Sequence, residues 1–265
     1  MKNIGFIGCG NMAKAMIKGI VHSKVIDSNK ISASSPNETE LAKAKDDFGI
    51  NVTPDNLEIV KKCDVIVLAV KPNMLQPVIN EISPLVDDSK VIVAISPGKT
   101  LDDLEKMFGK NVGIVRTMPN TPAMVMEGMT ALCKNVHVTD NDMDFIFSIM
   151  QSMGKAQIIK EELMNAVVAV SGSSPAYVYI FIEAMADAAV KCGMPRDMAY
   201  KFAAQSVYGS AKMVMETKLH PGILKDMVCS PGGTTIEAVK ALEDGGFRSA
   251  IMNAMEVCAE KAEDM

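Results

Sequence analysis

The first 118 residues alternate between short apolar runs and longer amphipathic segments. Runs such as residues 65–70 are hydrophobic at successive rather than alternate positions, which is typical of strands covered on both faces. Each run is followed by a segment with helical periodicity, so the pattern predicts an α/β fold with a doubly wound parallel sheet. The expected strands are residues 3–8, 30–35, 50–53, 64–70, 90–96 and 112–118, and the expected helices are residues 12–21, 40–48, 56–63 and 73–83.

The hydrophobic pattern changes near Lys160. Before this point we expect a strand after "MPNTPAMVMEGMTALCKN", a helix from about Asn141 and a strand over residues 156–160. Beyond it the strand signals disappear, and apolar residues follow helical spacing to the end of the chain. We therefore predict two domains, a sheet domain over residues 1–160 and an all-α domain over residues 161–265.

The C-terminal helices are rich in small and apolar side chains. Alanines and serines within residues 184–189 and 203–210 would let helix axes approach closely. About one hundred residues of this composition enclose too little interior to cover every apolar face, so we expect a second copy of the chain to cover part of it. The alternative is that these helices pack only on the first domain.

Composition and charge narrow the class of protein. The chain has 27 basic and 32 acidic residues, a net charge of -5 and no basic cluster, so we expect no nucleic-acid partner. The six cysteines form no CxxC pair and lie near no histidine in ligand spacing, which indicates a reduced protein without a metal site. The N-terminus lacks the features of a signal peptide, and "SGSSP" interrupts the most apolar later stretch, residues 166–182. We therefore expect a cytoplasmic protein with no membrane span.

Residues 8–13 read Gly-Cys-Gly-Asn-Met-Ala, between the first expected strand and the first expected helix. This G-x-G-x-x-A spacing is typical of dinucleotide sites. Gly8 makes the tight turn, Gly10 lets the backbone approach a diphosphate, and Ala13 lets the helix pack on the strand. The helix N-terminus adds unpaired N–H groups and a positive dipole end. An ordinary tight turn is the alternative, and the surrounding βαβ series argues against it.

The end of the second expected strand indicates which dinucleotide binds. An NAD enzyme usually places an acidic residue here, on the ribose hydroxyls. In this chain residues 33–37 read Ala-Ser-Ser-Pro-Asn, and Asp27 lies before the strand. Hydroxyl and N–H groups accept a 2′-phosphate that a carboxylate would repel, so NADP(H) is favoured and NAD(H) is the alternative cofactor. The same residues could instead only initiate the following helix.

The carboxyl ends of other expected strands meet at the same crevice, because ligands of such sheets bind outside those ends. "AVKP", residues 69–72, ends one strand and "MPNTP", residues 118–122, ends another. Asn56 precedes the fourth strand, where its amide could reach a ribose or a carboxamide. Lys71 could contact the cofactor or be a solvated lysine at a helix entry.

A second glycine turn, in "SPGGTTIEAVKALED", opens a helix without a preceding strand. The missing strand argues against a second nucleotide site. Gly232 and Gly233 allow close approach to successive N–H groups, and Thr234 or Thr235 is the expected N-cap at a positive helix end. Such a turn suits a small carboxylate. The alternative is a simple loop whose threonine caps a helix.

Six segments together resemble one enzyme family. They are "IGFIGCGNMA", "ASSP", "LAVKP", "MPNTP", "SGSSPAY" and "HPGILKDMVCSPGGTTIEAVKALEDGGFRSA". The chain resembles pyrroline-5-carboxylate reductase over essentially its whole length. The resemblance implies a Rossmann-type first domain, a helical dimerisation domain that interlocks with a second subunit, and assembly of dimers into decamers. It also implies NAD(P)H-dependent reduction of 1-pyrroline-5-carboxylate to L-proline, the last step of proline biosynthesis.

The same resemblance implies two groups of binding residues. The substrate carboxylate would rest on a late turn that reaches the site across the dimer interface, formed by Ser230, Gly232, Gly233, Thr234 and Thr235. The cofactor would be held by Ile7, Gly8, Cys9, Gly10, Asn11, Met12, Ser35, Asn56, Ala69, Val70, Lys71 and Pro72.

No side chain is assigned as a catalytic acid. A protonated imine is already a good electrophile, so the reaction depends on alignment more than on acid–base force. Many members of the resembled family have a threonine three residues before the SGSGPA motif, where this chain has Val168. Water or solution is then the expected proton source. The chain also has Ser174 where glycine is usual and Pro97 where alanine is common.

Two other functions fit part of the sequence. A β-hydroxyacid dehydrogenase has the same domain order but uses a lysine of the helical domain, and neither Lys191 nor Lys201 sits in a matching motif. An NADP-binding regulatory module without turnover would need no second anion site. Turnover with pyrroline-5-carboxylate, rather than with hydroxyacids, separates the three functions.

Overall fold

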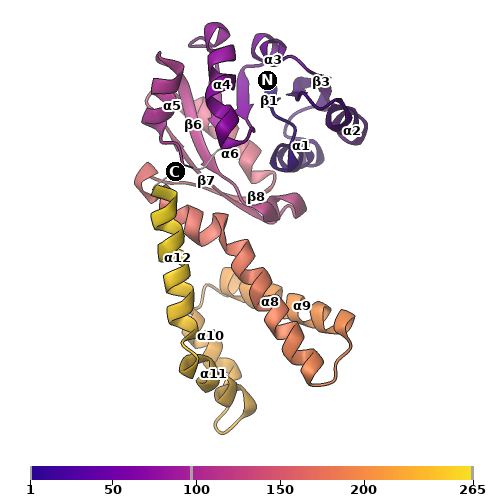
Figure 1. Ribbon diagram of the computed structural model, residues 1–265, viewed down its shortest axis with the longest axis vertical. Helices are drawn as coiled ribbons and strands as arrows, with labels where there is room; N and C mark the ends of the chain where they lie inside the picture. The colour runs from indigo at the N-terminus through magenta and orange to yellow at the C-terminus, as the bar shows by residue number, and fades with distance from the viewer. Residues whose placement is uncertain (1, 96–97, 264–265) are drawn as a thin grey trace. The chain divides into compact units, whose positions relative to one another are not determined.

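The computed structural model describes residues 2–95 and 98–263 of the chain (Figure 1). The chain divides into two compact units, Met1–Gly172 with Cys258–Met265, and Ser173–Val257. The first unit contains a sheet with helices and the second unit is helical, so the predicted fold class is confirmed. The predicted domain boundary after residue 160 precedes this division and stays a prediction. Pro97 lies outside the described residues.

The first unit is built on one sheet (Figure 1). Its strands are β1 (Ile4–Ile7), β2 (Ile31–Ser34), β3 (Asn51–Thr53), β4 (Val65–Leu68), β5 (Val91–Ala94), β6 (Gly113–Met118), β7 (Gly128–Lys134) and β8 (Gly154–Ile158). The strand order is β3-β2-β1-β4-β5-β6-β7-β8. Neighbours from β3 to β6 are parallel, as predicted. The order reverses at β1, between β2 and β4, which is the switch point where ligands bind in such sheets.

Helices cover both faces of the sheet. They are α1 (Asn11–Ser23), α2 (Glu38–Phe48), α3 (Asn56–Lys62), α4 (Pro72–Ile82), α5 (Leu101–Phe108) and α6 (Asp140–Gln151). Val65 and Val67 of β4 belong to the apolar cluster formed with α1, α2 and α6. Ile66 and Leu68 belong to the cluster formed with α3, α4 and α5. Both faces of the strand are therefore buried, which is why its apolar residues are consecutive.

The structure differs from the predicted elements in several places. The strand expected after residue 135 lies earlier, as β7 over Gly128–Lys134. The helix α5 was not predicted, although Thr100 and Asp103 form a capping box at its start and Gly109 ends it in the left-handed conformation. Strand β7 pairs antiparallel with β6, whereas β8 is parallel to β7. Residues 119–127 join β6 to β7 without the long crossover that a parallel neighbour requires.

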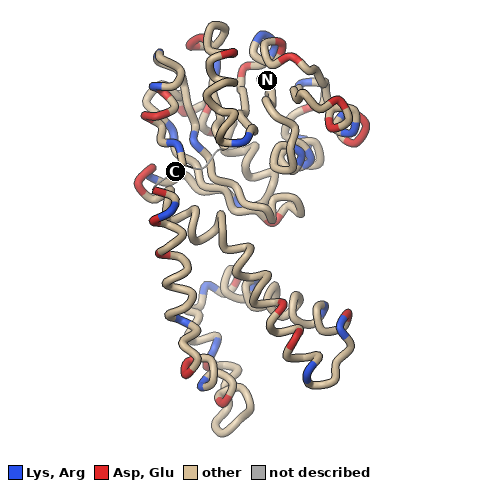
Figure 2. Tube along the Cα trace, in the orientation of Figure 1, with Lys and Arg blue, Asp and Glu red and all other residues tan. Residues whose placement is uncertain are grey.

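The second unit leaves much apolar surface open. Its helices are α8 (Ser174–Lys191), α9 (Arg196–Thr217), α10 (Pro221–Val228), α11 (Thr234–Asp244) and part of α12 (Phe247–Glu263). Ile180, Phe202 and Met227 are 66, 64 and 68 % exposed. Figure 2 shows the long uncharged start of α8, which carries no charge before Glu183. Patches of this kind mark surfaces that bind another protein surface, as the sequence predicted.

The sequence predicted that "SGSSP" interrupts the apolar stretch over residues 166–182. In the structure the helical path continues through this segment. Val168–Gly172 forms a π-helical turn between α7 (Met164–Val167) and α8. Pro175 lies in the first turn of α8, where a missing N–H group costs nothing. As a result the stretch Glu161–Lys191 is long and apolar enough, by length and composition, to cross a membrane. Helices that pack against another protein surface can have the same length and apolar composition.

Candidate dinucleotide and substrate sites

The turn between β1 and α1 is shaped by two glycines with different surroundings. Gly8 has a φ of +99°, and a Cβ placed on it would lie 2.4 Å from the Ala69 carbonyl oxygen at the end of β4. A Cβ placed on Gly10 would meet no atom within 4 Å. The first glycine is therefore required by the protein itself. The second leaves an open cradle at the start of α1, which a dinucleotide diphosphate fits.

The start of α1 carries no group that would compete with an anion. Gly10 is the N-cap and makes no side-chain cap, and the first turn contains no acidic residue. The first N–H groups of a helix lack partners within the helix and point outward. Burial raises the pKa of the Cys9 thiol above its ordinary value of 9.0; Lys14 lowers it and Glu40 raises it by smaller amounts, so Cys9 is neutral at pH 7. The residues predicted here, Asn11 and Met12 included, fit a diphosphate.

The predicted residues after β4 lie at the same edge of the sheet. Ile7, the last residue of β1, pairs with Leu68, the last residue of β4. Ala69 and Val70 follow directly and are half-buried, and the Ala69 N–H donates to the Ile7 carbonyl at 2.8 Å. Lys71 is the N-cap of α4 and is exposed, with Pro72 as the first helical residue. The backbone therefore brings residues 69–72 beside the glycine turn.

The residues after β2 start the next helix and include a buried serine. Ser35 is buried, and its hydroxyl accepts the Asn37 N–H at 3.2 Å. Asn37 caps α2 by accepting the Thr39 and Glu40 N–H groups, so the helix-initiation alternative is correct for Asn37. The Ser34 hydroxyl is fully buried and lies 2.7 Å from the Asn56 amide oxygen. Ser34 is thus occupied within the protein and positions Asn56, whose nitrogen donates to Glu81 Oε2 at 2.8 Å.

The late glycine turn has a different cap from the one predicted. The Gly233 N–H donates to the Ser230 carbonyl at 3.0 Å, closing a β-turn with Pro231 and Gly232 at its corner. Gly232 has a φ of +64°, as a type II turn requires. The N-cap of α11 is Gly233, so the prediction of Thr234 or Thr235 as the cap was wrong.

This correction leaves the threonines of the late turn available. Thr234 and Thr235 are the first two residues of α11, and the structure shows no hydrogen bond of either hydroxyl to the described residues. Their N–H groups belong to the unpaired start of a helix. Glu237 in the same turn is the one acidic group of this helix start. The segment therefore offers amides and hydroxyls to a small anion.

The two predicted groups of residues fall in different units of the chain. All the predicted cofactor residues lie in the first unit, and Ser230 to Thr235 lie in the second. Each group is formed within its own unit by local backbone geometry. Cys229, which precedes the late turn, is half-buried and is the C-cap of α10.

Comparison with known proteins was decisive. The chain is 50 % identical over 264 residues to pyrroline-5-carboxylate reductase of Escherichia coli (strain K12), covering 100 % of this chain and 98 % of the relative. The chain belongs to the pyrroline-5-carboxylate reductase family. The reductase of Glycine max is 39 % identical, over 99 % of this chain and 95 % of that protein. The resemblance predicted from the sequence and the oxidoreductase class are confirmed.

Family descriptions and solved structures agree with this membership. Residues 161–265 match the family described as pyrroline-5-carboxylate reductase dimerisation. Residues 3–98 match the family described as NADP oxidoreductase, coenzyme F420-dependent. The Plasmodium falciparum pyrroline carboxylate reductase with NADP bound has a TM-score of 0.90 at 36 % identity, covering 99 % of this chain and 97 % of that one. The Coxiella burnetii reductase has a TM-score of 0.93 at 34 % identity, covering 99 and 98 %.

In this member of the pyrroline-5-carboxylate reductase family, Asn120 makes two hydrogen bonds that the sequence did not predict. Asn120, in the "MPNTP" segment, donates to the Ser171 carbonyl at 3.0 Å and accepts the Met129 N–H at 2.9 Å. It therefore joins the end of β6 to the π-helical turn, where Val168 is buried. Asn120 and Ser171 are 51 residues apart in sequence, so the residues around either one give no sign of the contact.

One cavity lies beside β2, β3 and α3. It has a volume of about 560 Å³, and its lining includes Asn3, Asn29 and Lys30 before β1 and β2, the strand β3, and the lysines Lys45 and Lys62. These two lysines lie in the last turns of α2 and α3, where cations stabilise the negative ends of helix dipoles. The amino ends of strands are opposite to the ligand-binding edge of such sheets, so we assign no site to this cavity.

Proposed function

We propose that this chain reduces 1-pyrroline-5-carboxylate to L-proline with NADPH, the last step of proline biosynthesis. The 50 % identity to the Escherichia coli reductase over the full length is the observation that carries the proposal. The open cradle at Gly10 supports the cofactor, because a bare backbone at this point has no role in the packing of the first unit. NADPH is the preferred cofactor, with NADH as the alternative, since no carboxylate stands at the end of β2.

NADPH would supply the hydride that the imine carbon accepts. The diphosphate would lie on the N–H groups of Asn11 and Met12, beyond Gly10. Ser35 would contact the ribose phosphate, and Asn56 would contact a ribose. Ile7, Gly8 and Cys9 would lie beneath the dinucleotide and residues 69–72 beside it. Lys71, which is exposed at the start of α4, would pair with a phosphate.

The late glycine turn would bind the substrate carboxylate. Its N–H groups and the Thr234 and Thr235 hydroxyls suit a carboxylate at a positive helix end. We propose that the turn of one subunit serves the dinucleotide of its partner, since the matched dimerisation family covers the region that contains the turn. Holding the carboxylate fixes which face of the ring meets the nicotinamide, which is the main catalytic effect of the site.

The proton for the ring nitrogen would come from water or solution. Val168 has no hydroxyl, and the Ser171 hydroxyl donates to the Val167 carbonyl at 3.1 Å. The protein then contributes alignment and no acid. Hydride transfer to an already protonated imine needs no further proton in that step.

We further propose the larger organisation of the enzyme. Residues 1–160 would bind the dinucleotide and residues 161–265 would form the dimer and hold the substrate. The exposed apolar side chains of the second unit support a homodimer, and dimers would assemble further into decamers. We propose that the enzyme acts in the cytoplasm, with no nucleic acid or membrane as partner.

The direct test is turnover by the purified chain. NADPH oxidation should depend on added 1-pyrroline-5-carboxylate and yield one L-proline per NADPH, measured by nicotinamide absorbance and by chromatography of the product. Hydroxyacids with NADP+ should give no reaction. Activity with hydroxyacids, or cofactor binding without any turnover, would reject the proposal.

A further inference from the structure

Glu161 accepts two hydrogen bonds on a single carboxylate oxygen. Arg116 Nη1 donates to Glu161 Oε1 at 2.9 Å, and the Leu101 backbone N–H donates to the same atom at 2.7 Å. The Arg116 side chain is 6 % exposed and that of Glu161 is 31 % exposed. A buried guanidinium needs such a partner, because an unpaired buried charge is costly. Glu161 therefore joins β6 to the start of α5.

The two partners of Glu161 lie at the edge where the dinucleotide is proposed to bind. Arg116 pairs in register with Ala94, the last residue of β5. Ala94 pairs with Leu68, and Leu68 pairs with Ile7, so one row crosses the carboxyl ends of four strands. At a strand spacing of ~4.8 Å, Arg116 lies about 14 Å along this row from the residue before the glycine turn.

Leu101 is the first residue of α5, and Thr100 is its N-cap. The N–H of a first helical residue has no partner inside the helix, so the Glu161 carboxylate satisfies it and also faces the positive end of the helix dipole. The described residues Gly98, Lys99 and Thr100 lead from the carboxyl edge of β5 into this helix. Glu161 consequently holds the first residue of α5 beside Arg116 of β6.

We propose that Glu161 is a positioning residue for hydride transfer, acting through Arg116 and Leu101 rather than by contact with substrate. The inference rests on the proposed function. Ser35 assigns the adenosine end of the dinucleotide to the β2 side of the switch point, so the nicotinamide end extends past β4 toward β5 and β6. Glu161 holds the start of α5 and the Arg116 side chain on that side, where the imine ring and the nicotinamide must be aligned.

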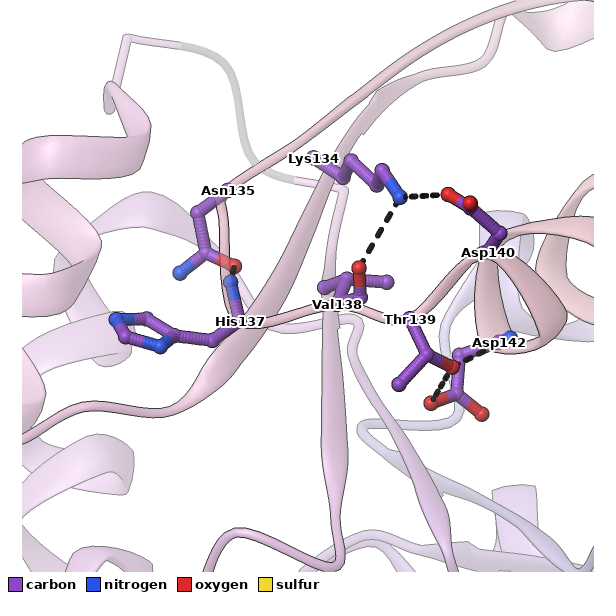
Figure 3. Close-up of polar contacts among 7 residues, drawn as sticks. All are labelled: Lys134, Asn135, His137, Val138, Thr139, Asp140 and Asp142. Carbon is purple, nitrogen blue, oxygen red and sulfur yellow. Dashed lines mark hydrogen bonds and ion pairs between the residues drawn. The ribbon is translucent and has the colours of Figure 1, made fainter.

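A purely structural ion pair is the competing explanation, and the chain offers a matched control at the opposite edge. Asn135 follows β7, beside the amino end of β6, and is buried. Its oxygen accepts the Ile114 N–H at 3.0 Å, and its nitrogen donates to the Val112 carbonyl at 2.8 Å. Figure 3 shows its oxygen also directed at the His137 N–H. Its nitrogen also donates to Glu105 Oε1, in the middle of α5, at 2.6 Å. Asn135→Ala should therefore destabilise the sheet and loosen α5 away from its start, while both hydrogen bonds of Glu161 stay in place.

The first experiment compares Glu161→Ala and Glu161→Gln with Asn135→Ala. Glu161→Ala should lower kcat about tenfold and change the Kd of NADPH by less than about twofold, because the diphosphate cradle is remote. Glu161→Gln keeps an oxygen acceptor and should recover most of kcat. Asn135→Ala should lower Tm while leaving kcat within about twofold of the parent chain. An equal loss of kcat in Asn135→Ala would overturn the proposal.

The second experiment removes the N–H donor without disturbing the ion pair. Leu101→Pro deletes the N–H at a first helical position, where proline is tolerated, and Leu101→Ala matches its loss of side chain while keeping the N–H. Leu101→Pro should show a kcat about threefold or more below that of Leu101→Ala. Equal kcat values for the two variants would overturn the role of this hydrogen bond.

Hydrogen exchange separates failure of this inference from failure of the proposed function. The Leu101 amide should exchange about tenfold faster in Glu161→Ala than in the parent chain, and near the parent rate in Glu161→Gln. This readout needs no turnover, so it tests the anchoring of α5 even if the chain forms no proline. An unchanged exchange rate at Leu101 in Glu161→Ala would overturn the proposal.

Discussion

A Cβ placed on Gly8 would lie 2.4 Å from the carbonyl oxygen of Ala69, so the end of β4 excludes every side chain from the first position of the glycine turn. Gly8 also has a φ of +99°, which side chains other than that of glycine rarely adopt. The dinucleotide turn is therefore part of the packing between β1 and β4. Binding and stability should be separable at its two glycines.

Gly8→Ala should destabilise the protein. The clash with a backbone oxygen and the positive φ together should cost about 3 kcal/mol in the free energy of unfolding. Urea unfolding followed by circular dichroism measures this difference. A variant as stable as the parent chain would show that the turn rearranges freely, in contradiction to the packing described.

Gly10→Ala should leave stability nearly unchanged and weaken NADPH binding. Its Cβ meets no protein atom within 4 Å, so stability should change by less than about 1 kcal/mol, whereas the methyl group would occupy the space of the diphosphate. We expect the Kd of NADPH to rise about tenfold or more, measured by nicotinamide fluorescence. Unchanged NADPH affinity would remove the cradle from the proposed site.

Thr235→Val should weaken substrate binding alone. The substitution preserves shape, and the hydroxyl it removes has no hydrogen bond to the residues the structure describes. One lost hydrogen bond to a carboxylate corresponds to a rise in KM for 1-pyrroline-5-carboxylate of about tenfold. The Kd of NADPH should stay within about twofold.

Thr217→Val is the matched control for this prediction. Thr217 ends α9 in the same unit, and its hydroxyl donates to the Met213 carbonyl at 2.7 Å, outside the late turn. Its KM should equal that of the parent chain. A parallel loss of NADPH and substrate affinity in Thr235→Val would contradict separate sites for the two ligands.

The cap of α5 should give a small, pH-dependent contribution to stability. The hydrogen bond from the Thr100 backbone N–H, and then that from the Thr100 side chain, hold the pKa of the Asp103 carboxyl below its ordinary value of 3.8. A lowered folded-state pKa contributes stability above the unfolded value, and this contribution is lost as the pH falls through the folded value.

Asp103→Asn tests that sign. The parent chain should exceed the variant in Tm by about 1 to 2 °C at pH 6, and the difference should shrink as the pH falls below about 4. Differential scanning calorimetry over this range measures it. A difference that grows on acidification would contradict the assigned protonation behaviour.

The sequence predicted those features that depend on local pattern. Consecutive apolar residues identified the parallel strands, and the spacing of Gly8 and Gly10 identified the dinucleotide turn, because both depend on a few adjacent residues. Thr100 and Asp103 also have the spacing of a capping box, yet the helix that follows Thr100 was not predicted. The prediction of a threonine as the N-cap of α11 was wrong because the turn from Ser230 already closes at Gly233, which is the N-cap.

Features that depend on distant contacts could not be predicted in this way. Arg116 and Glu161 are 45 residues apart, and Leu101 and Glu161 are 60 apart, so nothing in either neighbourhood indicates the other. The direction of β7 likewise depends on how its connection crosses the sheet edge. The family resemblance, carried by six separate motifs, supplied the function that periodicity alone left open.

The central claim is that one glycine turn binds the dinucleotide and the other orients the imine against it. A crystal structure of the protein with NADP+ and L-proline tests this most directly. We predict the proline carboxylate on the N–H groups of Thr234 and Thr235, with the ring C5 about 3 to 3.5 Å from the nicotinamide C4. A carboxylate bound elsewhere, with the late turn remote from the nicotinamide in every subunit, would contradict the account.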